Sequence, residues 1–562
     1  MKKLKHILLL PLLALSSFLL AQDITEVTKK IEQQKYTDAT AQMAKILEAT
    51  PTAETYFYSG YTAIRTQDLK AAKTFFEKGI ALDEKRHPLN KAGLGMVAHL
   101  EGKTSEADKI FEEVLKESRS KDPLILWRIG EAYTGYNNVN GDLEKSLYPH
   151  RDATKAILYL EKALKKDKKN AGIWLSLGDA RDLNEPRNGG PALTAYEYAL
   201  EYEGDKSVVN TRIGNIYYRG RSHNIASDFY KAAIKADSLY TPVYLQLADL
   251  NFKTNKYKEA AKYLNTYTKL VEKPSTDLLY NSAKYDFLAR EYNRAINKIE
   301  NNDAQINDPV KYRILGRSYF NLKNYAKTIE NVQSLMTYAP EKAEGIEYKI
   351  LGRSYQNGGV GVANDSLAIV YLAKAAKTDT TENIYSEIAE MSYQRKNYTN
   401  TIRFVEAGEK KFKKSSVKDK FWLAMAAYRL GRNDSTMYLK ADSAFAAVQE
   451  TNPDHLATVL YRAKANYYGH ANPDTAYMTS IPFYERFVEL ATTKKQEKNF
   501  KYDMKIALKY LYSYYIDEDK EPEKAMLFAE KGAELYPDDT DFKQMLNPQT
   551  MAEVANNTTN TR

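Results

Sequence analysis

One hexapeptide occurs twice in this chain, and this repetition constrains the fold more than any other feature. The sequence Ile-Leu-Gly-Arg-Ser-Tyr spans residues 314–319 and returns unchanged at 350–355. A small residue recurs in the same context at intervals that cluster between 33 and 36 residues. Its positions are Gly60, Gly95, Gly130, Gly178, Gly214, Ala248, Ala283, Gly316, Gly352 and Ala389. Self-similarity at this period is typical of repeat proteins, whose units stack on their neighbours to bury a core.

The residues that follow each small residue indicate two helices in every unit. An Ala usually follows twelve positions later, and a large apolar residue lies four positions beyond that Ala, as in Ala72 with Phe76 and Ala226 with Tyr230. Two helices cross closely only where side chains are small, and large residues one turn away then fill the groove beside the crossing. The spacing therefore predicts a series of helical hairpins.

The pattern resembles the tetratricopeptide repeat, a helix–turn–helix of about 34 residues with the motifs W-x2-L-G-x2-Y, A-x3-F and a final P. One matching unit consists of Tyr312, Leu315, Gly316, Tyr319, Tyr325, Val332 and Pro340, and another of Trp174, Leu177, Gly178, Ala192, Tyr196 and Ala199. The resemblance implies an all-α fold, a right-handed α-solenoid of about fourteen units. It also implies a concave groove, lined by the first helix of each pair, that holds extended peptides or partner helices.

The sequence divides into four parts. Residues 22–413 are predicted to form about eleven regular units, 414–540 less regular units, and 541–562 a capping segment with a polar tail. Residues 1–21 are predicted to be a secretory signal, because Lys2, Lys3 and Lys5 precede an apolar run over 7–20 that is shorter than the roughly 20 residues of a membrane helix. An uncleaved membrane anchor is the alternative. No later segment is long and apolar enough to span a bilayer.

Five units have a longer turn between their two helices. These turns lie at residues 137–151, 184–191, 357–365, 432–436 and 469–480. Because they fall at the same place in the unit, we expect them to project from one edge of the solenoid. Such loops can be contact sites, but insertions are also tolerated there at little cost in stability.

Composition and motifs exclude several kinds of chemistry. The chain has no Cys, which excludes disulfides, thiolate metal sites, cysteine nucleophiles and a lipid-bearing cysteine. No two His residues of the mature chain are spaced for one helix face, and there is no nucleophile elbow, phosphate loop or dinucleotide fingerprint. Residues 358–361 and 517–519 are better explained as an inserted turn and a helix start. The sequence predicts no enzyme, no catalytic residue, no cofactor and no metal.

Five cations are the most specific candidates for a binding site. They occupy groove-facing places, directly after the crossing residue or four positions before it, on three successive units: Lys284, Arg313, Arg317, Lys349 and Arg353. Guanidinium groups suit carboxylates, and several cations in one cleft raise the local concentration of anions. The hypothesis is that they receive an acidic segment or a terminal carboxylate. The alternative is a solvated helix face whose charges meet nearby Glu or Asp.

These observations predict a non-catalytic scaffold of the bacterial cell envelope that binds partner polypeptides in its concave groove. Its expected partners are one or more envelope proteins or peptides. The net charge of +9 is mild and spread out, and it does not predict a nucleic-acid binder. The expected location is the periplasm, with any outer-membrane association made through a partner. A periplasmic holdase for extended polypeptides is the first alternative, and an enzyme built on a helical-repeat frame is the second.

Overall fold

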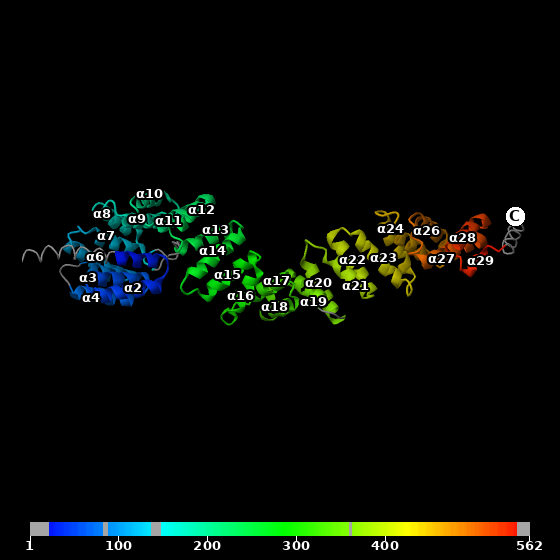
Figure 1. Ribbon diagram of the computed structural model, residues 1–562, viewed down its shortest axis with the longest axis horizontal. Helices are drawn as coiled ribbons and strands as arrows, with labels where there is room; N and C mark the ends of the chain where they lie inside the picture. Colours follow the sequence, from blue (N-terminus) through cyan, green and yellow to red (C-terminus); the bar gives the residue numbers. More distant parts are fainter. Residues whose placement is uncertain (1–21, 83–87, 137–147, 359–361, 548–562) are drawn as a thin grey trace, which may run out of the picture. The chain divides into compact units, whose positions relative to one another are not determined.

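The computed structural model describes residues 22–82, 88–136, 148–358 and 362–547, and every regular element in these ranges is a helix (Figure 1). Helical residues 22–32 form the first helix of the first pair, and α2 is the second. The later first helices are α3 (Ala53–Arg65), α5 (Pro88–Leu100), α7 (Pro123–Thr134), α9 (Ala171–Asn184), α11 (Lys206–Arg219), α13 (Pro242–Lys253), α15 (Thr276–Leu288), α17 (Val310–Asn321), α19 (Gly345–Gly358), α21 (Ile384–Gln394), α23 (Val417–Leu430), α25 (Leu456–Gly469) and α27 (Lys501–Ser513).

The second helices complete fourteen pairs among the described residues. They are α2 (Tyr36–Ala49), α4 (Leu69–Leu82), α6 (Thr104–Glu117), α8 (Ala153–Leu164), α10 (Gly190–Glu201), α12 (His223–Ala236), α14 (Tyr257–Leu270), α16 (Tyr292–Glu300), α18 (Tyr325–Tyr338), α20 (Val362–Thr378), α22 (Tyr398–Phe412), α24 (Thr436–Gln449), α26 (Pro473–Thr493) and α28 (Pro522–Leu535). Short helices η1 (Asp303–Gln305), η2 (Pro340–Lys342), η3 (Tyr514–Glu518) and α29 (Thr540–Met545) lie between or after them. The predicted all-α repeat fold is confirmed.

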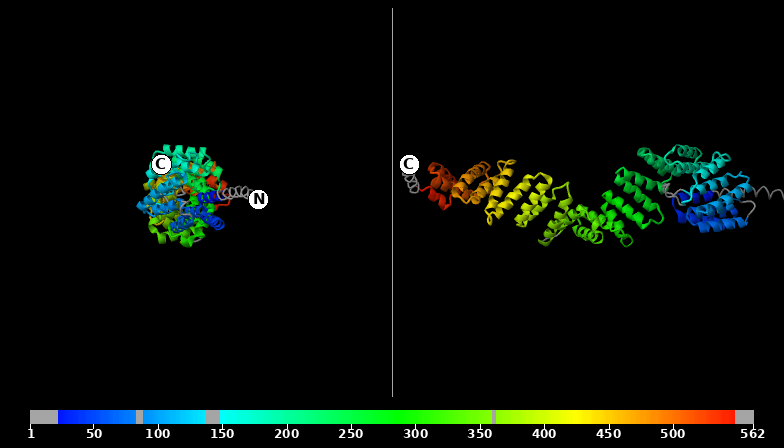
Figure 2. Two further views of the ribbon diagram at one scale, coloured as in Figure 1. Left: turned by 90° about the vertical axis from the view of Figure 1, so that its left-hand side faces the viewer. Right: turned by 180° about the vertical axis from the view of Figure 1, so that it is seen from behind.

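The chain comprises two compact units, Met1–Ile314 and Leu315–Arg562. Within each unit the two helices of a pair pack together, and a second helix also packs on the first helix of the next pair, as α8 does on α9 and α24 on α25. Figure 2 shows this pairing in the blue-to-green helices of the first unit and the yellow-to-red helices of the second. Each unit buries its apolar residues between successive pairs.

The small residues lie where the helices of a pair cross, as predicted. A Cβ atom added at Gly60 would lie 2.4 Å from the Phe76 ring, and one at Gly214 would lie 2.5 Å from the Tyr230 ring. Phe76 and Tyr230 are fully buried. Each large side chain therefore occupies the space that the missing side chain of glycine leaves.

The turns between paired helices commonly contain a residue in the left-handed region that is not glycine. Gln67, Arg290, Lys323 and Lys396 have φ values of 69°, 64°, 59° and 61°. L-residues other than Gly, Asn and Asp adopt this conformation at a cost of about 1 kcal/mol or more. The surrounding pair of helices holds the turn in place despite that cost.

The sequence analysis did not predict that the N-terminal segment would contact helices about two hundred residues later in the first unit. The side-chain amide of Gln33 donates to Asp237 Oδ2 at 2.7 Å, and Thr241 Oγ1 donates to the Gln33 carbonyl at 2.9 Å. The backbone N–H groups of Thr37 and Asp38 donate to the Glu272 carboxylate at 2.9 and 3.1 Å. Residues 33–38 therefore tie the first pair to the α12–α13 turn and to the end of α14.

Several predictions concern residues that lie outside the described ranges. These are the signal at 1–21, most of the turn at 137–151, the centre of the turn at 357–365 and the tail from 548. Near the C-terminus, Phe542 of α29 is fully buried, and a Cβ atom at Gly532 would lie 2.2 Å from its ring. Helix α29 therefore covers the end of α28.

Candidate partner-binding surfaces

The predicted cations of the second unit form ion pairs with the next helix pair. Arg317 Nε of α17 lies 2.6 Å from Glu347 Oε1 of α19, and the Glu347 side chain is fully buried. Arg353 of α19 pairs with Glu387 of α21 at 2.9 Å and also contacts Glu382. Each arginine therefore joins the first helix of its own pair to the carboxylates of the following pair.

Lys349 completes this set of ion pairs. Its Nζ lies 2.7 Å from Asp379 Oδ2 and 3.3 Å from Glu382 Oε2. The hydrogen bond from Lys349, with further bonds from Thr381, holds the pKa of Asp379 well below its usual range. Asp379 is therefore ionised at neutral pH, and its negative charge balances the positive charge of Lys349.

The other two predicted cations, Lys284 and Arg313, belong to the first unit. Lys284 Nζ lies 3.9 Å from Asp308 Oδ2 and 4.0 Å from the centre of the Tyr280 ring. Arg313 lies half-buried on α17 and also has an interaction partner. Lys284 and Arg313 therefore lie in a different unit from Arg317, Lys349 and Arg353.

Carboxylates therefore lie against Lys284, Arg317, Lys349 and Arg353 in this structure. An acidic ligand would have to displace them, so the structure gives no preference for acidic over mixed-charge partners. This agrees with the alternative stated from the sequence, that the charges meet nearby Glu or Asp, although the acceptors themselves were not named because they are 24 to 34 residues away, on the next pair. The groove-facing places in each unit indicate where the cations lie, but they do not indicate which acidic residues of the following pair lie against those cations.

The same kind of pair continues along the first helices of the second unit. Glu390 of α21 lies 2.6 Å from Lys418 of α23, and Lys464 of α25 contacts Asp503 of α27. Lys509 of α27 reaches Asp541 of α29 at 2.5 Å. These first helices therefore carry both donors and acceptors rather than a field of one sign.

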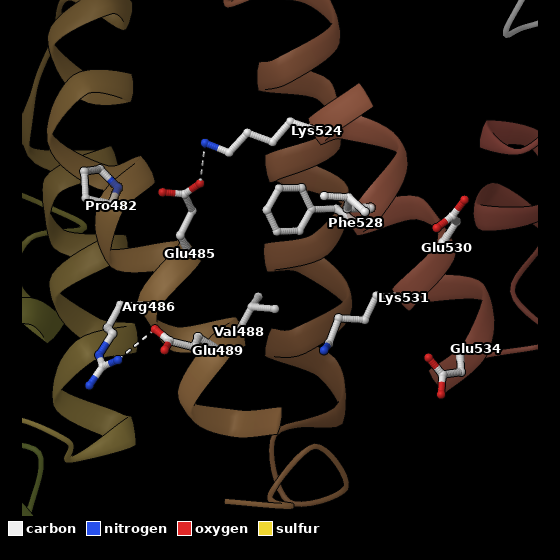
Figure 3. A pocket seen from close by; sticks show the side chains of 11 residues that line it. Pro482, Glu485, Arg486, Val488, Glu489, Lys524, Phe528, Glu530, Lys531 and Glu534 are labelled. Carbon is white, nitrogen blue, oxygen red and sulfur yellow. Dashed lines mark hydrogen bonds and ion pairs between the residues drawn. The ribbon is translucent and has the colours of Figure 1, made fainter. Parts of the chain in front are cut away.

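A second surface of the second unit is an open groove between α26 and α28, with a cavity volume of about 720 Å³ (Figure 3). Val488 and Phe528 line it together with charged residues of both signs. Lys524 pairs with Glu485 at 2.9 Å across the groove, whereas Arg486 pairs with Glu489 on α26 itself at 2.7 Å. The groove belongs to second helices, so it is separate from the first-helix surface.

In the first unit, first helices also carry buried charged pairs. Arg65 of α3 binds Glu32 at 2.7 Å, Arg128 of α7 binds Glu131 at 2.5 Å, and Arg212 of α11 binds Asp179 of α9 at 3.1 Å. Glu131 and Asp179 directly follow Gly130 and Gly178, which is one of the places expected to face the groove, whereas the three arginines were not among the predicted site residues. A search for basic residues three or four positions from those acids would have found Arg128.

The N-terminal helix lies against these first helices of its own unit, where Glu32 pairs with Arg65 of α3. Residues 24–32 line one side of a cavity whose other walls come from α3, α7, α9 and α11. In this unit the chain itself therefore covers part of the face that the sequence analysis assigned to a partner.

Comparison with known families agrees with the repeat pattern. The tetratricopeptide repeat model matches residues 53–86 and 241–272, which correspond to the pairs α3–α4 and α13–α14. The chain therefore contains tetratricopeptide repeats. The matched segments have the same helix–turn–helix arrangement as the other pairs, so the repeat extends over the described chain.

One similar solved structure is the C-terminal part of a TPR repeat-containing protein from Cytophaga hutchinsonii. It is 25% identical to this chain with a TM-score of 0.33, and the match covers 48% of this chain and 99% of that one. Pseudomonas aeruginosa pilF matches at 17% identity and a TM-score of 0.30, and the match covers 41% of this chain and 97% of pilF. A protective antigen of uropathogenic Escherichia coli with an SLR fold is 16% identical with a TM-score of 0.26. That match covers 90% of this chain and 97% of the antigen. No curated protein matches the chain.

One buried cluster has the residue types of a catalytic pair but not the access. Lys298 Nζ lies 2.6 Å from both Ser282 Oγ and Asp286 Oδ2, and burial lowers the pKa of Lys298. A lysine of lowered pKa beside a hydroxyl is a known way to activate a nucleophile. Ser282 and Asp286 are fully buried, however, so a substrate could not reach the hydroxyl. The cluster holds α15 and α16 together.

Within the described ranges, no group of three or more His, Cys, Asp or Glu side chains is arranged to hold a metal ion. None of the helices in those ranges combines the length and apolar character that crossing a bilayer requires.

Proposed function

We propose that this tetratricopeptide-repeat protein is an exported scaffold of the bacterial cell envelope, and that it binds a partner polypeptide on the first helices of its second unit. The repeat fold supports a protein-interaction scaffold in general terms. The basic and apolar pattern of residues 1–21 supports export, and the absence of cysteine from the sequence argues against a lipid anchor.

The observation that carries the binding proposal is the presence of charged groups of both signs on the first helices of the second unit, as in Arg353–Glu387 and Glu390–Lys418. An extended polypeptide presents N–H donors and C=O acceptors in turn. A surface that carries both donors and acceptors can bind such a backbone without requiring one sign of charge. In this proposal Arg317, Lys349 and Arg353 are contact residues for a partner of mixed charge.

The experiment reverses one pair without breaking it. The double variant Glu390→Lys with Lys418→Glu keeps an ion pair between α21 and α23 but exchanges donor and acceptor. The matched control is Lys440→Glu with Glu406→Lys, an exposed pair at 2.6 Å between second helices α24 and α22. After crosslinking in native cells, the first-helix swap should reduce recovery of the partner at least several-fold, and the control should not.

Equal recovery of partners by both folded variants would contradict the proposed surface. Recovery of many proteins in small and variable amounts would favour the holdase alternative, because a scaffold should retain few partners in fixed ratio.

A further inference from the structure

The open groove between α26 and α28 is a candidate binding surface that the first helices do not share (Figure 3). Its volume is about 720 Å³. On α28 the lining runs from Lys524 to Glu534, which corresponds to a rise of about 15 Å along a helix axis. The groove therefore has room for about three turns of a bound helix.

The floor of the groove is apolar and accessible. Leu527 is 63% exposed, Pro482 is exposed and Phe528 is half-buried, whereas Val488 is buried. Figure 3 shows Val488 and Phe528 between the charged side chains of α26 and those of α28. An apolar strip with charged rows on both sides matches the surface of an amphipathic helix, which has one apolar stripe bordered by polar residues.

Ion pairs within the protein already engage the charged residues near α26. Lys524 Nζ lies 2.9 Å from Glu485 Oε1. Arg486 lies between two acids, with Glu489 at 2.7 Å and Asp454 at 2.6 Å. These cations are therefore not available to attract an acidic ligand.

The charged residues further along α28 are mostly acidic. Glu530 and Glu534 are exposed, line the groove and form no ion pair with another described residue. They lie four positions apart, so they share one side of the helix. Lys531 is the one lining base that forms no ion pair within the described ranges. The charges left for a ligand therefore favour a basic one.

Pro482 adds a backbone acceptor to this excess of negative charge. A proline inside a helix has no N–H for the carbonyl four positions earlier, and in α26 that carbonyl belongs to Met478. Met478 is 76% exposed and lies one turn from Pro482, which lines the groove. This end of the groove therefore also suits a ligand rich in hydrogen-bond donors, as Lys and Arg side chains are.

We propose that the groove between α26 and α28 binds an amphipathic helix of a partner protein, with an apolar stripe bordered by Lys or Arg. The stripe packs on Val488, Leu527 and Phe528, and the basic residues pair with Glu530 and Glu534. This surface belongs to second helices and does not depend on the polypeptide proposed for the first helices, so either proposal can fail without the other.

The test uses the full chain and labelled peptides of about 18 residues, long enough to form a helix. The probe has Leu along one helical stripe and Lys on the other face. A second peptide has Glu in place of Lys, and a third has the composition of the probe in scrambled order. Fluorescence anisotropy should show saturable binding of the probe and at least about 10-fold weaker binding of the other two. Circular dichroism should show that the probe gains helix in the complex.

The double variant Glu530→Lys with Glu534→Lys should weaken binding of the probe about 10-fold, because two attractive contacts become repulsive. The matched control is Glu197→Lys with Glu201→Lys, two exposed positions with the same spacing on second helix α10. At physiological salt, charges more than about 8 Å apart are largely screened. The control should therefore leave the affinity nearly unchanged.

Leu527→Ser tests the apolar contact. Because Leu527 is mostly exposed, the variant should keep the thermal midpoint of the parent but bind the probe several-fold more weakly. Leu158→Ser, at an exposed position on α8, should not weaken binding. No saturable binding of the probe, equal binding of the acidic or the scrambled peptide, or equal effects of the two double charge variants would overturn the proposal.

Discussion

The carboxylate of Glu272 accepts hydrogen bonds from the backbone N–H groups of Thr37 and Asp38, more than two hundred residues earlier in the chain. These two N–H groups belong to the first turn of α2, where helices have donors without an internal acceptor. Glu272, two residues past the end of α14, therefore caps the N-terminus of α2 from a distance. The contact fixes the first pair of helices to a pair much later in the first unit.

Loss of this cap should loosen the N-terminal segment. Glu272→Gln removes the charge, and we expect residues 22–38 to exchange amide hydrogens several-fold faster, as for loss of a cap worth about 1 kcal/mol. Glu77→Gln, an exposed position on α4, is the control. Exchange in α5 and α6 should not change in either variant.

Acid should act on the same contact. Burial alone would raise the pKa of Glu272, but the bonds from Thr37 and Asp38 outweigh it and lower the pKa below its usual value of 4.5. The stabilisation is therefore complete above pH 4.5 and disappears as the pH falls through the lower, folded-state pKa. The protection factors of residues 22–38 in the parent chain, which compare exchange with the intrinsic rate at each pH, should fall only below about pH 4.5, and a fall near neutral pH would contradict this.

The crossing glycines should not tolerate a methyl group. A Cβ atom at Gly60 would lie 2.4 Å from Phe76, so Gly60→Ala should lower the free energy of unfolding by about 1–3 kcal/mol through overpacking. Adding Phe76→Leu should recover part of the loss. At Gly190 a Cβ atom would meet only an Asn188 oxygen at 3.5 Å, and Gly190→Ala should be neutral or stabilising. Urea unfolding followed by circular dichroism checks all three.

The buried pair of Lys298 and Asp286 should be costly to break. Lys298→Met leaves the fully buried Asp286 without its closest cation, and we expect a loss of about 3–5 kcal/mol in urea unfolding. Replacing both, with Lys298→Met and Asp286→Leu, should recover much of it. A single variant as stable as the parent would show that the pair contributes little.

The left-handed turn residues offer a test in the stabilising direction. Lys323 is exposed with a φ of 59°, so Lys323→Gly should stabilise the chain by about 0.5–1 kcal/mol. Lys262→Gly, at an exposed position inside α14, should instead destabilise by about 1 kcal/mol. Opposite shifts of the thermal midpoint are expected, and shifts of the same sign would contradict the assignment of strain to Lys323.

A feature of this fold can be predicted from the sequence when the residues that form it lie close together along the chain. The crossing of Gly60 over Phe76 depends on residues 16 positions apart in one pair, so the repeat pattern reveals it. The acceptor of Arg353 is Glu387 on the next pair, and it becomes visible only when the two first helices are placed side by side.

The contacts of residues 33–38 with Asp237 and Glu272 depend on the rotation accumulated over several pairs of helices. A pattern within one repeat unit does not reveal this accumulated rotation, so it cannot predict these contacts. The cavity beside residues 24–32 was missed for the same reason, since its arginines come from α3, α7 and α11 and become neighbours only in the folded unit.

Site-specific photocrosslinking in native cells tests the central claim most directly. A photoreactive amino acid at Glu390, on first helix α21, is compared with one at Glu406, on second helix α22. Partner binding on the first helices predicts one or a few proteins crosslinked in fixed amounts at position 390 and none of them at 406. The same products at both positions, or none at 390, would contradict it.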